Sequence, residues 1–460
     1  MADPIVTVNP ATGKVIERYD TMTAAELDKS LTAAVAAQVT WAGLDVKERT
    51  ALLRRAGGEL RRRREELAGL AVAEMGKPIG EALGEVDKCA WVCDYYAEQA
   101  PHALADEQVT AGGSRSWVSY EPLGVVLAVM PWNFPYWQVF RFAVPALAAG
   151  NAGLLKHAPN VTGCALAIQE LFTAAGASGG LFTTLLVAEP DVPRAVASLV
   201  ADDRVAAVTL TGSNGAGAHV AAAAGRAVKK SVLELGGSDP FIVLADADLD
   251  VVVPKAVTGR FINSGQSCLA AKRFLVHASR AEEFTRYFAE QVAALRVGDP
   301  ADPRTKVGPL ARADLAAALR RQVDDSVAAG ARTATGGAPL SRGPAWFAPT
   351  VLTDVTPDMP VMAEETFGPV AAVMAFRDDD EAVRLANLTR YGLGASVWSA
   401  DEAHALAVGR RIASGALFIN AVVASDPRLP FGGVKQSGYG RELGTAGARE
   451  FTNVRTVLVG

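Results

Sequence analysis

Apolar and polar positions divide the chain into a helical N-terminal part and a longer part in which strands and helices alternate. Apolar residues recur every three or four positions over residues 23–39, 46–75 and 79–99, which predicts three amphipathic helices. Further along, the pattern predicts strands at 125–130, 153–156, 183–187 and 205–211 and helices at 137–149, 162–175, 192–200 and 217–225. Continuous apolar, β-branched runs suit strands that are buried on both faces. The alternation therefore predicts a doubly wound parallel sheet.

A second alternation begins after residue 231 and predicts a second α/β unit, with strands at 232–235, 241–244 and 273–277 and a helix at 249–263. Residues 114–120 alternate like an exposed antiparallel strand, and residues 450–459 end the chain in strand-like residues. An apolar strand left unpaired at a terminus invites aggregation. We therefore expect residues 450–459 to pair with residues 114–120 of a partner chain.

The composition is that of a packed protein and not of a disordered one, because half of the 460 residues are hydrophobic and 21% are charged. This length allows two or three domains. A net charge of −5 argues against a nucleic-acid partner, and the one dense basic run, residues 61–64, is interpreted as a solvated helix face. No apolar run reaches the ~18 residues of a membrane span, and no signal-peptide pattern is seen. We expect a cytoplasmic protein without a membrane partner.

Four cysteines in so long a chain do not form a disulfide framework. Cys89 and Cys93 lie one helical turn apart, but neither has a nearby histidine or second cysteine pair, so we predict no metal site. Cys268 differs, because it follows Gly265 in a polar turn, residues 263–268, after an apolar helix. Such a turn can expose a thiol that acts as a nucleophile. A plain structural cysteine is the alternative.

Two further segments place polar groups where they are unexpected. Glu234 lies inside an apolar, strand-like run and is followed by two glycines. A buried glutamate has a raised pKa that suits a general base, and a salt-bridged structural residue is the alternative. Asn133 belongs to the segment Pro-Trp-Asn-Phe-Pro, residues 131–135, directly after a predicted strand. Ligands of open α/β sheets bind at such strand ends, where a side-chain amide can donate to an oxyanion. A rigid aromatic turn is the alternative.

The order and spacing of these segments resemble those of the aldehyde dehydrogenase superfamily. Supporting segments span nearly the whole chain and lie at 211–213, 365–369, 430–433 and 437–438, with Lys435 between the last two. Residues 150–160 and 234–243 are similar to those of bacterial succinate-semialdehyde dehydrogenases. The resemblance implies an α/β fold with a Rossmann-type cofactor domain at 1–108 and 123–233, a catalytic domain at 234–445 and a small β oligomerisation arm at 109–122 and 446–460. It also implies a homodimer or homotetramer.

The resemblance implies a role for each of the three reactive residues. Cys268 would attack the aldehyde carbon, Asn133 and the backbone N–H of Cys268 would hold the oxyanion, and Glu234 would activate the water that hydrolyses the resulting thioester. We expect succinic semialdehyde as the substrate, with another ω-carboxy or aliphatic aldehyde as the alternative. A non-catalytic relative would be expected to have lost one of the three residues. A coenzyme-A-acylating enzyme would not need Glu234.

The resemblance also implies a site for NAD(P). Gly212 and Ser213 follow a predicted strand and open a helix, whose N-terminus can face a pyrophosphate. By resemblance, the remaining cofactor-binding residues are Trp132, Leu235, Glu365, Phe367, Lys156, His157, Ala158 and Pro159. NAD-preferring relatives often carry a glutamate where this chain has Pro159, three residues after Lys156. Without that carboxylate, Lys156 and His157 can attract a 2′-phosphate, so we expect NADP to be preferred and NAD to be possible.

The resemblance implies two residues that bind the substrate carboxylate, Arg141 and Ser425. Semialdehyde enzymes place an arginine at the first position, in the substrate tunnel, and a serine at the second, and Arg428 in the same loop is a possible helper. Some relatives carry a further arginine where this chain has Ile262, and the nearest arginine here is Arg260. This departure leaves glutarate semialdehyde or another ω-carboxy aldehyde open.

Overall fold

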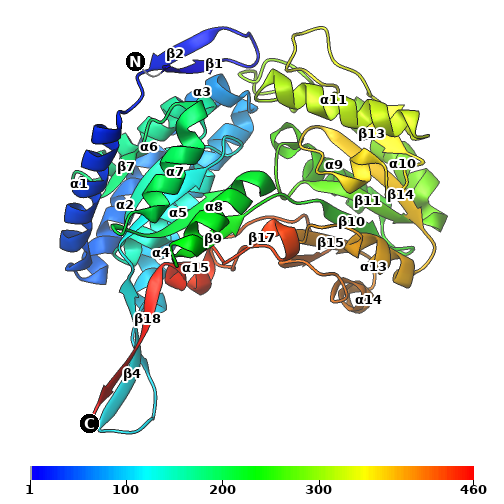
Figure 1. Ribbon diagram of the computed structural model, residues 1–460. Coiled ribbons are helices and arrows are strands. Elements are labelled where there is room, and N and C mark those ends of the chain that lie inside the picture. The colour runs from blue at the N-terminus through cyan, green and yellow to red at the C-terminus, as the bar shows by residue number, and fades with distance from the viewer. Residues whose placement is uncertain (1–2) are drawn as a thin grey trace.

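The computed structural model describes residues 3–460, which form two α/β lobes and a projecting β arm (Figure 1). In Figure 1 the first lobe, blue to green, lies on the left and the second lobe, green to orange, lies on the right. The last strand of the chain runs down the arm, so that the C-terminus lies at its tip. Among the described helices, none combines the length and the apolar character that crossing a membrane requires.

The first lobe is built on a six-stranded sheet with the order β17-β9-β8-β5-β6-β7. Its strands are β5 (Val125–Met130), β6 (Ala152–His157), β7 (Phe182–Thr184), β8 (Val205–Thr211), β9 (Lys230–Glu234) and β17 (Gly438–Tyr439). The first five run parallel, as the alternation predicts, and β17 is antiparallel to β9. β7 is shorter than the predicted strand 183–187, because the carbonyl of Leu186 accepts a hydrogen bond from the backbone of Met22 outside the sheet.

Helices pack around this sheet and account for the apolar periodicity of the N-terminal part. They are α1 (Ala24–Ala42), α2 (Val46–Arg62), α3 (Arg64–Met75), α4 (Ile79–Ala103), α5 (Trp137–Ala148), α6 (Thr162–Ala174), α7 (Val192–Ala201) and α8 (Asn214–Arg226). A short hairpin of β1 (Ile5–Val8) and β2 (Val15–Tyr19) precedes them. Because β17 comes from residues 438–439, the sheet of the first lobe takes one strand from the range that the sequence assigned to the catalytic domain.

The second lobe is built on a seven-stranded sheet with the order β12-β13-β14-β11-β10-β15-β16. Its strands are β10 (Asp239–Val243), β11 (Ala271–His277), β12 (Arg332–Thr335), β13 (Thr350–Thr353), β14 (Val370–Phe376), β15 (Gly394–Trp398) and β16 (Ala416–Ile419). Its helices are α9 (Leu249–Phe261), α10 (Ala278–Ala293), α11 (Ala313–Ala328), α12 (Pro360–Ala363), α13 (Asp379–Asn387) and α14 (Glu402–Gly409). All neighbouring strands are parallel except the pair β12 and β13 at one edge.

The arm is an antiparallel sheet with the order β18-β4-β3. Its strands are β3 (Glu107–Gln108), β4 (Arg115–Pro122) and β18 (Thr452–Val459), and α15 (Gly444–Glu450) leads into the last of them. β18 pairs with β4 along its whole length and within the same chain, from Thr452 opposite Pro122 to Val459 opposite Arg115. We expected residues 450–459 to pair with residues 114–120 of a partner chain. The two segments do pair, but they belong to the same chain, so the expectation of a partner chain is wrong. The sequence pattern shows that the two strands match, but it does not show which copy supplies each.

The predicted helix 46–75 is in fact two helices, α2 and α3. Arg63 leaves helical geometry at φ −97° and ψ 14°, and its guanidinium lies 2.5 Å from Glu66 and 3.3 Å from Glu170. Helical periodicity is judged over a window of many residues, so the sequence pattern does not reveal a break at a single residue. Arg61 and Arg62 have exposed side chains, as the interpretation of a solvated face requires, but Arg64 is half-buried and the side chain of Arg63 is only 12% exposed.

Two helices of the cavity region differ in their ends from the predictions. α8 begins three residues earlier than predicted, because the Ser213 hydroxyl accepts the N–H of Ala216 at 3.3 Å and caps the helix. α9 ends two residues earlier than predicted, because Asn263 and Ser264 adopt left-handed backbone angles with φ of 53° and 54°. Such angles are uncommon for residues other than glycine and persist where the surroundings hold them.

Candidate active site

A cavity of about 410 Å³ opens at the carboxyl ends of β5, β8 and β9. It is lined by Pro131, Trp132, Asn133, Gln138, Thr211, Gly212, Ser213, Glu234, Leu235, Gly236, Cys268, Arg312, Leu315, Glu365 and Phe367. The structure thus brings the three predicted reactive residues together with six of the predicted cofactor residues. The remaining predicted residues, Lys156, His157, Ala158, Pro159, Arg141 and Ser425, do not line this cavity.

Two sets of contacts hold the turn that carries Cys268. Gly265 has φ +75°, and a Cβ at this position would lie 2.3 Å from the carbonyl oxygen of Gly368, so only glycine fits. Lys272, fully buried, donates from Nζ to the carbonyl oxygens of Ser267 and Cys268 at 3.0 and 2.9 Å. These contacts fix the direction in which the half-buried Cys268 thiol faces the cavity.

The surroundings of the Cys268 thiol disfavour its thiolate form. Burial raises its pKa to about 11, although the charges of Arg141 and Lys272 act in the opposite direction. Because the thiolate is the nucleophile, the reaction needs a group that accepts the thiol proton. The other cysteines, Cys89, Cys93 and Cys164, are fully buried, and burial raises their pKa values as well.

Glu234 is the carboxylate best placed for proton transfer in this cavity. It ends β9 with only 2% of its surface exposed, and burial raises its pKa to about 8. Glu442 raises this pKa further, while the nearby charge of Arg141 lowers it. Its Oε1 has no hydrogen-bond partner within residues 3–460. A carboxylate with this pKa and a free oxygen can accept a proton from water near neutral pH.

Asn133 supplies a hydrogen-bond donor to the same cavity. Its side chain is 4% exposed, and its Nδ2 donates one hydrogen to the backbone carbonyl of Gln266 at 3.1 Å. The backbone carbonyl oxygen of Asn133 accepts a hydrogen bond from the Asn263 side chain at 2.7 Å. A side-chain amide carries two N–H groups, so one stays available for an oxyanion in the cavity.

The cofactor-binding face of the cavity combines a helix N-terminus with two aromatic rings. α8 begins beside the cavity, and a Cβ on its Gly217 would lie 2.5 Å from Leu235, so helix and strand end approach closely. Trp132 and Phe367 pack edge to face with ring centroids 5.7 Å apart. Glu365 accepts the N–H of Gly237 at 3.1 Å. A helix N-terminus with free N–H groups suits a pyrophosphate, so these residues fit a dinucleotide.

The segment from Lys156 to Pro159 ends β6 beside a neighbouring cavity of about 590 Å³, which Pro159, Glu189 and Arg312 help to line. Lys156 is buried, and burial lowers its pKa to about 8. His157 is also buried, and burial lowers its pKa to about 4. Its Nδ1 accepts the N–H of Ala158 at 2.8 Å, and its Nε2 lies 2.8 Å from a backbone carbonyl.

The expectation that His157 helps to attract a 2′-phosphate is therefore wrong, because the ring is neutral and both of its nitrogens are engaged. The sequence reasoning also missed Arg312, which lines both cavities and is paired with Asp314 at 2.8 Å. No local motif marks Arg312. It reaches the site only because the loop before α11 crosses over the first lobe.

Arg141 does not open into the cavity of Cys268. It is 1% exposed, forms an ion pair with the buried Glu442, and donates to Thr211 Oγ1 at 3.3 Å. Its guanidinium also lies 4.5 Å from the ring centroid of Phe431. The resemblance implies that Arg141 binds the substrate carboxylate in the substrate tunnel, and the sequence gave no sign of Glu442, which lies far along the chain.

Ser425 is buried and accepts a hydrogen bond from Lys88 Nζ at 2.8 Å, a contact that the sequence did not indicate. Neither Ile262 nor the nearby Arg260 takes the place of the further arginine that some relatives carry. Ile262 is 40% exposed, and Arg260 is fully buried and donates to the backbone carbonyls of Val370 and Thr366 at 2.6 and 2.9 Å.

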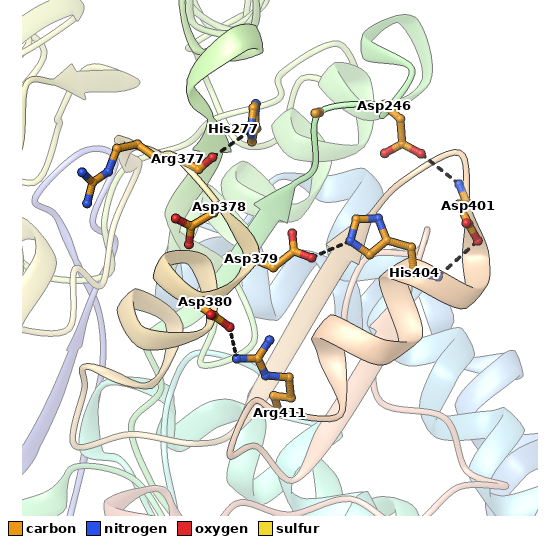
Figure 2. A pocket seen from close by; sticks show the side chains of 10 residues that line it. Asp246, His277, Arg377, Asp378, Asp379, Asp380, Asp401, His404 and Arg411 are labelled. Atoms are coloured by element: carbon orange, nitrogen blue, oxygen red, sulfur yellow. Dashed lines mark hydrogen bonds and ion pairs between the residues drawn. The ribbon is translucent and has the colours of Figure 1, made fainter.

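A larger hollow of about 750 Å³ lies in the second lobe and shares no lining residue with the cavity of Cys268 (Figure 2). Its charged side chains pair with one another: His404 lies 2.6 Å from Asp379, and Arg411 lies 2.5 Å from Asp380. Within residues 3–460, no group of three or more histidine, cysteine or carboxylate side chains is arranged to hold a metal ion. We assign no role to this hollow.

A cysteine, a buried glutamate and a side-chain amide around a cavity that a helix N-terminus borders indicate a nucleotide-dependent oxidoreductase. The chain belongs to the aldehyde dehydrogenase family, whose family model matches residues 2–457.

Known relatives and solved structures are similar to this chain over nearly its full length. The chain is 50% identical over 455 residues to the probable succinate-semialdehyde dehydrogenase (NADP+) of Synechocystis sp., with 99% of each chain covered. It is 49% identical over 467 residues to succinate-semialdehyde dehydrogenase (NADP+) 1 of Mycobacterium ulcerans, covering 99% of this chain and all of that one. The crystal structure of succinic semialdehyde dehydrogenase from Streptococcus pyogenes with NADP+ superposes with a TM-score of 0.95, at 37% identity and 99% coverage of both chains.

Proposed function

We propose that this protein oxidises succinic semialdehyde to succinate with NADP, through a thioester on Cys268. The observation that carries the proposal is the meeting of Cys268, Glu234 and Asn133 in one cavity beside the N-terminus of α8. The names of the relatives supply the substrate and the cofactor. Another ω-carboxy aldehyde, such as glutarate semialdehyde, is the second candidate, because Ile262 stands where some relatives carry a further arginine.

The residues of the cavity account for the chemistry in two stages. In the first, the S–H bond of Cys268 breaks and its proton passes to solvent water, the sulfur bonds to the aldehyde carbon, and the electron pair of the C=O bond moves to the oxygen, where the free N–H of Asn133 donates. NADP, when bound, supplies the hydride acceptor for this carbon. In the second, Glu234 takes a proton from water, the hydroxyl attacks the thioester carbon, and the C–S bond breaks to give the acid. The sulfur then takes the proton from Glu234, which restores both the thiol and the carboxylate.

The test is the initial rate of reduced cofactor formation with succinic semialdehyde, glutarate semialdehyde and butanal, each measured with NADP and with NAD. We expect the highest kcat/KM with succinic semialdehyde and NADP, in the absence of coenzyme A. A rate that requires coenzyme A would identify an acylating enzyme. Equal kcat/KM for butanal and both semialdehydes would remove the carboxylate from the recognised substrate.

The cofactor preference depends on the absence of a carboxylate at Pro159. We predict that Pro159→Glu lowers kcat/KM with NADP by about tenfold or more, because the new carboxylate repels the 2′-phosphate and pairs with Lys156. The measurement is kcat/KM for both cofactors at a saturating aldehyde concentration. Pro159→Ala is the matched control and should keep the wild-type ratio, since it alters the backbone without adding charge. An unchanged ratio in Pro159→Glu would show that other residues recognise the ribose.

We also propose that the arm joins subunits into a homodimer or homotetramer. One edge of β18 has no strand beside it within residues 3–460, and Val454 and Leu458, on one face of β18, are 62% and 54% exposed. Replacing both by lysine should dissociate the assembly, as measured by sedimentation velocity at micromolar concentration. Val228→Lys, at a valine that is 92% exposed elsewhere, is the control. A wild-type protein that sediments as a monomer would contradict the proposal.

A further inference from the structure

Lys88 is a half-buried cation on α4, and the side chains that its ammonium contacts are neutral. Its Nζ donates to Ser425 Oγ at 2.8 Å and lies 4.3 Å from the ring centroid of Trp137. Within residues 3–460 it forms no salt bridge. A buried ammonium is stable when it is paired, and Lys88 lacks a pair, so its surroundings favour an incoming anion.

The carboxylates near Lys88 are already engaged. Asp426 is paired with Arg428 at 2.7 Å. Glu85, one helical turn before Lys88, forms a buried ion pair with Lys77 and accepts the backbone N–H groups of Tyr136 and Trp137 at 2.8 and 2.9 Å. Neither carboxylate is therefore free to neutralise Lys88.

Arg141 and Lys88 differ in how their charges are balanced. Arg141 forms an ion pair with Glu442, whereas Lys88 has no ion-pair partner among the described residues and is also repelled by the positive charge of Arg141. Burial and this repulsion together lower the pKa of Lys88 to about 8, so the ammonium still predominates at neutral pH. An anion bound at Lys88 would offset both the cost of burying the ammonium and its repulsion by Arg141.

The position of Lys88 connects it with the reacting cysteine. Trp137, beneath the ammonium, is followed on α5 by Gln138, which lines the cavity of Cys268. Arg141, one turn further along α5, is close enough to affect the pKa values of both Lys88 and Cys268. Lys88 therefore lies beside the same end of α5 that borders the cavity.

Ser425 completes a site for a carboxylate. Its oxygen accepts the hydrogen bond from Lys88, so its own O–H is free to donate elsewhere. An ammonium carries three N–H groups, and only one of those on Lys88 is used by Ser425. A carboxylate beside the pair can receive one hydrogen bond from each side chain.

We propose that Lys88, with the Ser425 hydroxyl, binds the distal carboxylate of the aldehyde substrate. The inference rests on the proposed function and deepens it, because it names the residue that selects an ω-carboxy aldehyde over an uncharged one. Lys88 is a binding residue and takes no part in the transfer of protons or hydride.

The test compares succinic semialdehyde with butanal, which has the same chain length and no carboxylate. We expect Lys88→Met to lower the ratio of the two kcat/KM values about 10- to 100-fold, mainly through a higher KM for succinic semialdehyde, because a hydrogen-bonded charge contact is lost. Lys88→Arg should keep most of the ratio, since the charge remains. Ser425→Ala should lower the ratio by less than Lys88→Met does. Lys47→Met, the same replacement on the exposed face of α2, is the matched control.

A direct binding measurement keeps the proposal testable if Lys88→Met turns over poorly. Succinate should inhibit the wild-type enzyme in competition with the aldehyde, and its inhibition constant should rise at least tenfold in Lys88→Met, with unchanged thermal unfolding confirming the fold. A wild-type enzyme that does not favour succinic semialdehyde over butanal would overturn the proposed function. A wild-type enzyme that does favour it, with the same ratio and the same inhibition constant in Lys88→Met, would overturn the role of Lys88 alone.

Discussion

Replacing Cys268 by alanine should abolish aldehyde oxidation, with a loss of kcat on the order of 10⁵-fold, because the covalent route to hydride release disappears with the sulfur. The effect is large because no second thiol lines the cavity: the other cysteines are fully buried in the described structure. The measurement is the steady-state rate of NADPH formation with succinic semialdehyde, followed over hours to detect a residual rate.

Cys93→Ala is the matched control, since it removes a thiol that is buried within α4 and lies outside the cavity. We expect this variant to keep wild-type kcat and KM. Mass spectrometry of the wild-type enzyme incubated with the aldehyde and NADP, then quenched in acid, should find the acyl group on Cys268. An acyl group on another residue, or a Cys268→Ala variant within tenfold of the wild-type rate, would contradict the mechanism.

Replacing Glu234 by glutamine should lower the steady-state rate by about 10²- to 10⁴-fold, because the thioester then lacks the group that takes a proton from water. The first turnover should still release about one NADPH per active site, as a burst that precedes the slow phase. Rapid-mixing absorbance at 340 nm measures both phases. A variant with a slow steady state and no burst would place the role of Glu234 before hydride transfer and would contradict the assignment.

The same residue sets the expected pH dependence of the wild-type enzyme. Burial raises the pKa of Glu234 to about 8, so its carboxyl is mostly protonated at pH 7 and becomes able to accept a proton as the pH rises through this value. We therefore expect kcat to rise about tenfold per pH unit below the pKa and to level off above it. Glu234→Gln should lose this dependence in its slow phase.

Local sequence alone predicted the fold class and singled out the candidate reacting residues. Apolar runs such as 125–130 are readable because a strand buried on both faces needs apolar side chains at every position. Cys268 and Glu234 stood out because a thiol in a polar turn and a carboxylate in an apolar run both depart from what packing alone would select. Each of these signals is contained within a few consecutive residues, so no tertiary information was needed to find them.

The tertiary structure decided which charges are free. Arg141 is paired with Glu442, His157 is kept neutral by burial, and Lys88 is left without a counter-ion among the described residues beside Ser425, 337 residues away in the chain. Charge balance and burial depend on segments that meet only after folding, and a residue type at one position does not reveal its partner. For the same reason, the sequence showed that β18 needs a partner strand, but only the structure showed that β4 of the same chain supplies it.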